Sequence, residues 1–85
     1  MSDKPLRKTI VSVINKVRTD SGREPLEPQD GDGLMSDIGL DSLDLAQLVA
    51  ELERATGVDP FRSGGQAART LGDLVQVYEA QVKKP

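Results

Sequence analysis

The chain has no histidine, no cysteine and no tryptophan, and it has a single tyrosine and a single phenylalanine. Without histidine and cysteine it cannot form a Ser-His-Asp triad, a thiolate nucleophile or a zinc site of the His/Cys kind. It also has no disulfide framework, so nothing in the sequence indicates an oxidising compartment. Two aromatic side chains provide no stacking platform for single-stranded nucleic acid.

Long apolar runs and a basic surplus are missing as well. No apolar run approaches the roughly 18 residues of a membrane span, and the N-terminus lacks the apolar core of a signal peptide. The net charge of −3 and the pI of about 4.8 argue against a nucleic-acid partner. With 85 residues, we expect one soluble, cytoplasmic domain over residues 1–85, with its core at about 5–82.

The charge is distributed unevenly along the chain. Residues 1–19 carry a net charge of +4, residues 20–59 carry −9, and residues 60–85 carry +2. A local charge of −9 can steer a basic partner toward this part of the molecule. The alternative is that these acids only keep a small domain soluble.

Apolar residues repeat at three- and four-residue spacing in three segments, which predicts three amphipathic helices and an all-α fold. Asp41 is placed to cap the second helix, and Gly57 is placed to end it in a left-handed conformation. Thr70 and Asp73 resemble a capping box for the third helix. The predicted apolar faces consist of Leu6, Ile10, Val13, Ile14 and Val17, then Leu45, Leu48, Val49 and Leu52, then Leu71, Leu74, Val75, Tyr78 and Val82.

Two connections of different length join these helices. Residues 19–40 contain two prolines and four glycines and are predicted to form a long loop. Residues 58–69 form the second connection, in which residues 66–69 can make one short helical turn. The fold expected is a small four-helix bundle with three main helices, one short helix and a long first loop. The apolar residues expected to anchor the long loop are Leu26, Leu34, Met35, Ile38 and Leu40.

Ser42 lies at the predicted start of the second helix, after a turn that Gly39 permits. A hydroxyl there is exposed at the positive end of the helix dipole, and a phosphodiester on it would gain from that dipole and from free backbone N–H groups. The simpler alternative is that serine and aspartate at this point only cap the helix.

Residues 37–44 read Asp-Ile-Gly-Leu-Asp-Ser-Leu-Asp, and with the helix order they resemble the acyl carrier proteins, which are phosphopantetheine-binding four-helix bundles. The resemblance covers roughly residues 5–82. It implies that a phosphopantetheinyl transferase attaches 4′-phosphopantetheine from coenzyme A to Ser42. The arm would then carry acyl or aminoacyl groups as thioesters to loading and processing enzymes. It also implies a carrier without catalytic residues, and we expect a monomer.

The resemblance also implies a surface around Ser42 that partner enzymes recognise. Each candidate residue has a structural alternative: a helix cap for Asp41, a first-turn acid for Asp44, loop packing for Leu43, and a solvated face for the acids of the second helix. The candidates for partner recognition are Asp41, Leu43, Asp44, Gln47, Glu51 and Glu53.

Some positions depart from the pattern of fatty-acid carriers. Gln47 stands where many of them have a recognition glutamate, and Arg54 stands in a run that is often acidic. Residues 59–69 carry two arginines and one acid. These departures favour a specialised carrier for polyketide, nonribosomal peptide or modified-lipid assembly over a housekeeping fatty-acid carrier.

A calcium site and an unmodified interaction domain are the alternatives to a carrier. The acidic run at residues 30–33 lacks the third oxygen ligand and the glycine of an EF-hand loop, because Leu34 and Met35 occupy those positions. We therefore interpret it as a flexible acidic turn and predict no metal site. The remaining alternative to a carrier is an unmodified helical interaction or regulatory domain that works through its acidic face.

Overall fold

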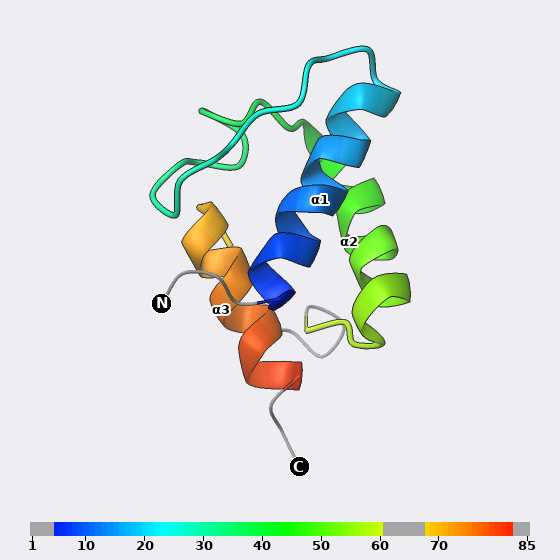
Figure 1. Ribbon diagram of the computed structural model, residues 1–85, viewed down its shortest axis with the longest axis vertical. Helices are drawn as coiled ribbons and strands as arrows, with labels where there is room; N and C mark the ends of the chain where they lie inside the picture. Colours follow the sequence, from blue (N-terminus) through cyan, green and yellow to red (C-terminus); the bar gives the residue numbers. More distant parts are fainter. Residues whose placement is uncertain (1–4, 61–67, 83–85) are drawn as a thin grey trace.

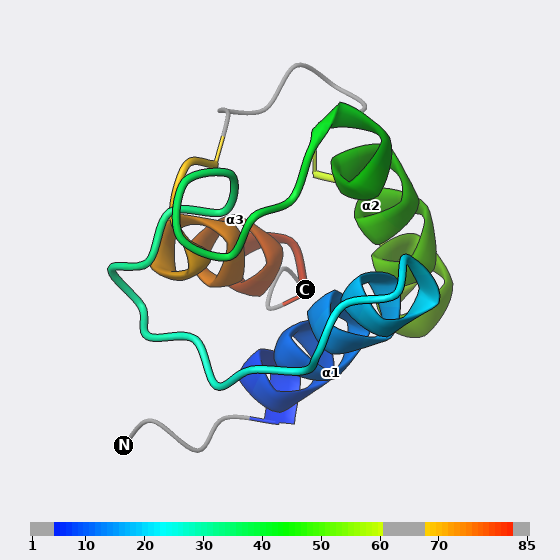
Figure 2. The ribbon, with the colours of Figure 1, turned by 90° about the horizontal axis from the view of Figure 1, so that it is seen from above.

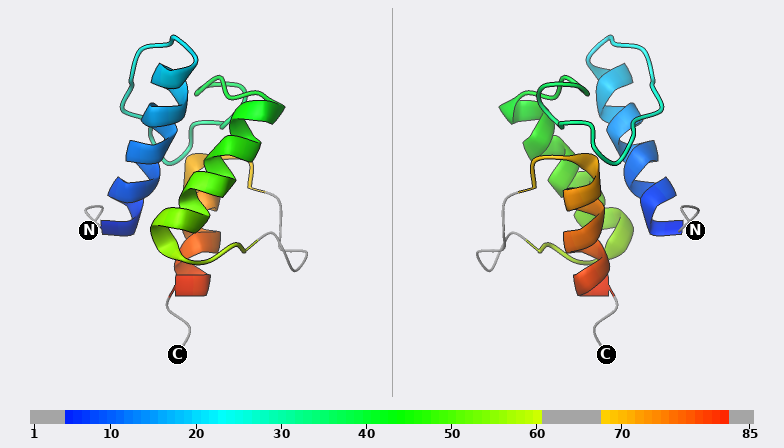
Figure 3. Two further views of the ribbon diagram at one scale, coloured as in Figure 1. Left: turned by 90° about the vertical axis from the view of Figure 1, so that its right-hand side faces the viewer. Right: turned by 90° about the vertical axis from the view of Figure 1, so that its left-hand side faces the viewer.

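Three helices make up more than half of residues 5–60 and 68–82, the parts of the chain that the structure, a computed structural model, describes. They are α1 (Pro5–Asp20), α2 (Ser42–Thr56) and α3 (Leu71–Val82). α1 runs in the opposite direction to α2 and α3 and contacts both (Figures 1 and 3). The all-α prediction is confirmed for these residues, whose only β-type pairing is an isolated bridge between Gly33 and Thr70.

The core is formed where the apolar faces of the three helices meet the α1–α2 loop. Burying each of its large side chains contributes about 1.5–3 kcal/mol of transfer free energy. Most of the predicted helical faces lie in this core, while Leu6, Val13, Leu45 and Val75 are partly buried at its edge. The buried residues are Ile10, Ile14, Val17, Leu34, Ile38, Leu40, Leu48, Leu52, Leu71, Leu74 and Tyr78.

Four of the five predicted anchors of the long loop contact the core. Leu34, Ile38 and Leu40 are buried, and Leu26 is partly buried. Both backbone groups of Leu26 pair with the amide side chain of Asn15 on α1, at 2.9 Å each. The prediction for Met35 is wrong, because its side chain is 56% exposed. Leu34 already occupies the core position in this turn.

The acidic turn of the loop is fastened to the start of α3. The N–H of Leu71 donates to the carbonyl of Asp32 at 3.0 Å, and the N–H of Gly72 donates to the carbonyl of Asp30 at 2.8 Å. A Cβ on Gly72 would lie 3.1 Å from that Asp30 oxygen, so glycine allows this close approach. Figure 2 shows the loop passing over the first turn of α3. The expectation of a flexible turn is therefore corrected, because its carbonyls satisfy free N–H groups of α3.

The predicted helix ends are also confirmed. Gly57 has a φ of +79° and donates its N–H to the carbonyl of Glu53 at 2.7 Å. At α3 the N–H of Asp73 donates to Thr70 Oγ1 at 3.1 Å, and the N–H of Thr70 donates to Asp73 Oδ2 at 3.3 Å. Of the segment predicted as a short fourth helix, residues 66 and 67 lie outside the described residues. Ala68 and Arg69 are not helical.

Candidate functional site

Ser42 is the first residue of α2, and its side chain is exposed. Asp41 precedes it in an extended conformation and forms the N-cap of the helix. The backbone N–H groups of this first turn have no partner within the helix and give it a partial positive charge. Within residues 5–60 and 68–82, no side chain or backbone group hydrogen-bonds to the Ser42 hydroxyl. That hydroxyl is therefore open to an incoming reagent.

A capping box fixes the turn that carries Ser42. The N–H of Asp44 donates to Asp41 Oδ1 at 2.8 Å, and the N–H of Asp41 donates to Asp44 Oδ2 at 3.2 Å. The predicted capping role of Asp41 is confirmed. Its side chain is also exposed, so a contact with a partner enzyme stays a prediction beside the cap.

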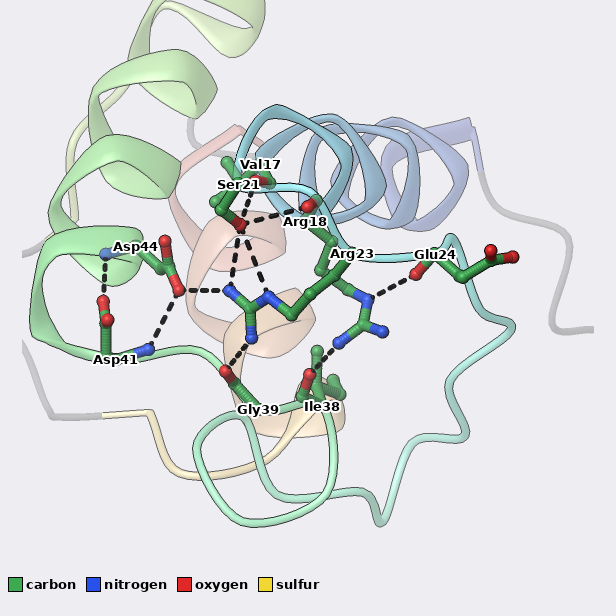
Figure 4. A network of polar contacts seen from close by, with 9 residues as sticks. All are labelled: Val17, Arg18, Ser21, Arg23, Glu24, Ile38, Gly39, Asp41 and Asp44. Atoms are coloured by element: carbon green, nitrogen blue, oxygen red, sulfur yellow. Dashed lines mark hydrogen bonds and ion pairs between the residues drawn. The ribbon is translucent and has the colours of Figure 1, made fainter.

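Asp44 is mostly buried, unlike an acid that is exposed for contact with a partner. The residue is only 8% exposed, and its Oδ2 lies 2.5 Å from Arg23 Nη2. The hydrogen bond from the Asp41 backbone, and after it the Arg23 guanidinium, hold the pKa of Asp44 below its usual value. The carboxylate thus serves the helix start and the α1–α2 loop (Figure 4). Direct recognition of Asp44 by a partner stays a prediction.

Two arginines hold the turn that leads into Ser42. Arg18, in the last turn of α1, donates to the carbonyl of Ile38, and Arg23 donates to the next carbonyl, that of Gly39 (Figure 4). Neither arginine was predicted as a site residue. For Arg23 the available signal was the rarity of bases in this region, because Arg23 and Arg54 are the only ones in residues 20–59, whereas nothing in the sequence distinguished Arg18 from the other bases of residues 1–19.

Leu43 follows Ser42 directly and is 81% exposed. Together with Met35, it forms the pair of large apolar side chains that are exposed within the described residues. The explanation of Leu43 by loop packing is wrong, because the side chain packs on nothing that buries it. Its contact with a partner enzyme stays a prediction.

The polar side chains further along α2 are partly engaged by α1. Gln47 is exposed, and its Nε2 donates to Asp20 Oδ2 at 3.4 Å. Glu51 is half-buried and accepts from Lys16 Nζ at 3.2 Å. The expectation of a freely solvated face therefore needs correction for Glu51, whose charge is partly balanced by a base on the neighbouring helix.

Glu53 lies on α2 within electrostatic reach of Tyr78. Burial raises the pKa of Tyr78 to about 12, and the charges of Asp59 and Glu53 add to this effect. Glu53 itself is half-buried. Whether a partner enzyme contacts it stays a prediction.

Within the described residues, no three acidic side chains gather in a way that would hold a metal ion. Asp37, in the α1–α2 loop, accepts the N–H of Gly33 at 2.7 Å. None of the three helices has the length and apolar character needed to cross a membrane, as far as the described parts of the chain go.

Comparison with known proteins agrees with this geometry. Residues 11–77 match the family model described as "Phosphopantetheine attachment site". The chain is 28% identical over 82 residues to an acyl carrier protein of Prochlorococcus marinus (strain MIT 9515), and the match covers 95% of this chain and 98% of that protein. No solved structure matches significantly. The chain therefore belongs to the phosphopantetheine-attachment family, and it is a carrier protein with 4′-phosphopantetheine as its prosthetic group.

Proposed function

We propose that Ser42 is the attachment residue for 4′-phosphopantetheine and that the protein presents acyl or aminoacyl groups to biosynthetic enzymes. The observation that carries this proposal is the exposed Ser42, at the first position of a 15-residue helix, whose hydroxyl has no hydrogen-bond partner among residues 5–60 and 68–82. The positive end of the helix dipole, and the N–H groups of the first turn that Asp41 does not bind, favour a phosphodiester. Ser42 also lies inside the matched residues 11–77. The residues present thus fit the group.

Attachment is a transfer from coenzyme A catalysed by a second protein. The Ser42 oxygen forms a bond to the β-phosphorus, and the phosphoanhydride bond to the nucleotide leaving group breaks. The hydroxyl proton passes to a base on the transferase, and the absence of histidine and cysteine from this chain is compatible with that. The attached arm supplies a thiol on which acyl groups are held as thioesters. The protein is thus a substrate of other enzymes and not a catalyst.

The partners proposed are a phosphopantetheinyl transferase and the acyl-loading and acyl-processing enzymes of a fatty-acid, polyketide or related pathway. Asp41 and Leu43, the neighbours of Ser42 in the chain, are both exposed, which supports them as direct contacts of these enzymes. Gln47 and Glu51, one helical turn apart, extend this surface along α2, and Glu53 is proposed as a contact on another side of the same helix. For Asp44 we propose an indirect part through the capping box, since Arg23 already binds its carboxylate.

The pathway proposed is a specialised one rather than housekeeping fatty-acid synthesis. The support is Gln47, which is exposed on α2 without the charge of the glutamate that many fatty-acid carriers have there, and the exposed Arg54. We further propose that the protein works in the cytoplasm as a monomer. Its apolar helical faces are covered by one another and by the α1–α2 loop, which supports a monomer.

Intact-mass measurement tests the attachment. The protein is incubated with coenzyme A, Mg²⁺ and a broad-specificity phosphopantetheinyl transferase, next to Ser42→Ala and to Ser36→Ala, which removes another exposed serine nearby. A gain of one phosphopantetheine in the wild type and in Ser36→Ala, but not in Ser42→Ala, supports the proposal. No gain with several active transferases would indicate an unmodified interaction domain instead.

A further inference from the structure

The turn before Ser42 is held by side chains that come from a distant part of the chain. Arg18 and Arg23 lie 20 and 16 residues before the carbonyls of Ile38 and Gly39 to which they donate. The other end of the Arg18 guanidinium donates through Nε to the carbonyl of Glu24 at 2.9 Å. Two consecutive carbonyls of the turn are thus tied to the end of α1 and the residues that follow it.

The Arg23 guanidinium donates hydrogen bonds to three different residues. Its Nη1 donates to the Gly39 carbonyl, its Nη2 to Asp44 Oδ2 at 2.5 Å, and its Nε and Nη2 reach Ser21 Oγ at 3.4 and 3.2 Å. These contacts use the planar fork of the guanidinium group, which a lysine ammonium cannot reproduce. Arg23 therefore joins the turn, the first turn of α2 and Ser21, the residue directly after α1, at one point (Figure 4).

Gly39 shows independently that the turn is shaped around the two guanidinium groups. Its φ is +84°, in the region that favours glycine. A Cβ at this position would lie 3.3 Å from Arg23 Nη1 and 3.7 Å from Arg18 Nη1. The guanidinium groups thus occupy the space beside the glycine that a side chain would otherwise take.

The same contacts reach Ser42 through the capping box. Asp44 Oδ2 accepts from Arg23 and also from the N–H of Asp41, the residue directly before Ser42. Without Arg23, the mostly buried Asp44 carboxylate loses its charged partner and the Gly39 carbonyl loses its donor. The first turn of α2 then has fewer contacts to fix it, and the direction of the Ser42 hydroxyl is less well defined.

We infer that Arg23, assisted by Arg18, is a positioning residue that holds the Ser42 turn in the conformation the transferase uses. This inference rests on the proposed attachment at Ser42. Arg23 touches neither the reacting oxygen nor coenzyme A, and its effect passes through Gly39, Asp44 and Asp41. Pre-set geometry of this kind raises the rate of the reacting complex more than the affinity for the partner.

Steady-state modification of Arg23→Gln tests the inference, with Arg54→Gln as the matched control. Arg54 is exposed on α2, and its replacement removes the same charge without touching the turn. For Arg23→Gln we expect kcat to fall about tenfold with little change in the KM for the carrier. Arg23→Lys should recover part of the loss, and Arg54→Gln should keep the kcat of the wild type.

Amide hydrogen exchange on the unmodified protein gives a second readout that does not depend on the transferase. In Arg23→Gln, the amides of residues 40–45 should exchange faster, while those of α3 keep their protection. A wild-type kcat together with unchanged exchange at residues 40–45 would overturn the inference. If Arg23→Gln does not fold, the same two measurements are made on Arg23→Lys. Failure to modify Ser42 in the wild type would refute the proposed function alone, because the exchange experiment still tests the contacts.

Discussion

Lys16 Nζ on α1 lies 3.2 Å from Glu51 Oε2 on α2 and 3.2 Å from Asp20 Oδ2. The hydrogen bonds to Glu51 and Asp20, in that order, raise the pKa of Lys16 above its usual value. An exposed pair of this kind contributes little to stability, but it changes the field that an approaching partner meets. A base on α1 therefore weakens the acidic surface that the sequence alone predicts along α2.

Replacing Lys16 by glutamine should speed association with a basic partner enzyme, because Glu51 and Asp20 lose their neutralising charge. The kcat/KM for modification is expected to rise about two- to threefold at low salt, and the gain should disappear at high salt. Lys8→Gln, at another exposed lysine of α1, is the control for net charge. Equal gains in both variants would contradict a specific effect at Glu51.

The environment of Asp44 predicts a loss of stability in acid. Its pKa in the folded protein is below the ordinary value of 3.8, so the unfolded chain binds more protons between these two values. The stabilisation is complete above the ordinary value and is lost as the pH falls through the pKa of the folded state. Asp44→Asn should be less stable than wild type at neutral pH and should lose less stability on acidification.

Urea unfolding at neutral pH and at steps below about pH 4 measures this difference. Glu24→Gln removes an exposed carboxyl group from the same loop and serves as the control. Parallel acid curves for the wild type and Asp44→Asn would contradict the prediction.

Asp41 allows its two roles to be separated by experiment. Asp41→Ala removes the cap of α2 and should lower the free energy of unfolding by about 0.5–2 kcal/mol, whereas asparagine caps nearly as well as aspartate. If the carboxylate also contacts the transferase, Asp41→Asn should be modified more slowly while remaining stable. Urea unfolding and modification kinetics on both variants decide this. If Asp41→Asn is modified at the wild-type rate, Asp41 serves only as the cap of α2.

The helices and their caps, which depend on neighbours within about four residues, are the parts of the fold that the sequence predicts best. Spacing was enough for the three helices, and the caps at Asp41, Gly57 and Thr70 were predicted because each bonds within its own turn. Met35 was predicted wrongly, since apolar character does not tell which of two adjacent loop residues faces the core. The contacts of Arg18 and Arg23 were missed because they join residues 16 to 21 positions apart.

Replacing Gly39 even by alanine should lower the stability of the protein. With a φ of +84° it is in a conformation that costs about 1–2 kcal/mol for a residue with a Cβ. Gly39→Ala is expected to lower the free energy of unfolding by about that amount, with a further loss from the crowding of Arg23. Gly31→Ala is the control, because nothing lies within 4 Å of the position that its new Cβ would occupy. Similar unfolding curves for both variants would contradict the described turn.

Gln47 tests whether the missing charge on α2 restricts the choice of partner enzymes. Gln47→Glu should increase acyl transfer by fatty-acid synthase enzymes, because it restores a negative charge at an exposed position that their carriers commonly use. The new carboxylate would face Asp20, to which Gln47 Nε2 now donates at 3.4 Å, so a slight loss of stability is expected.

Gln76→Glu, at an exposed position of α3, adds the same charge away from α2 and is the control for Gln47→Glu. Transfer rates are compared on fully modified protein, so that differences in attachment at Ser42 do not enter. A higher rate for Gln47→Glu alone would mean that charge at this position limits recognition. Unchanged rates would remove Gln47 as support for a specialised carrier. That assignment would then rest on Arg54 and the basic residues of 59–69.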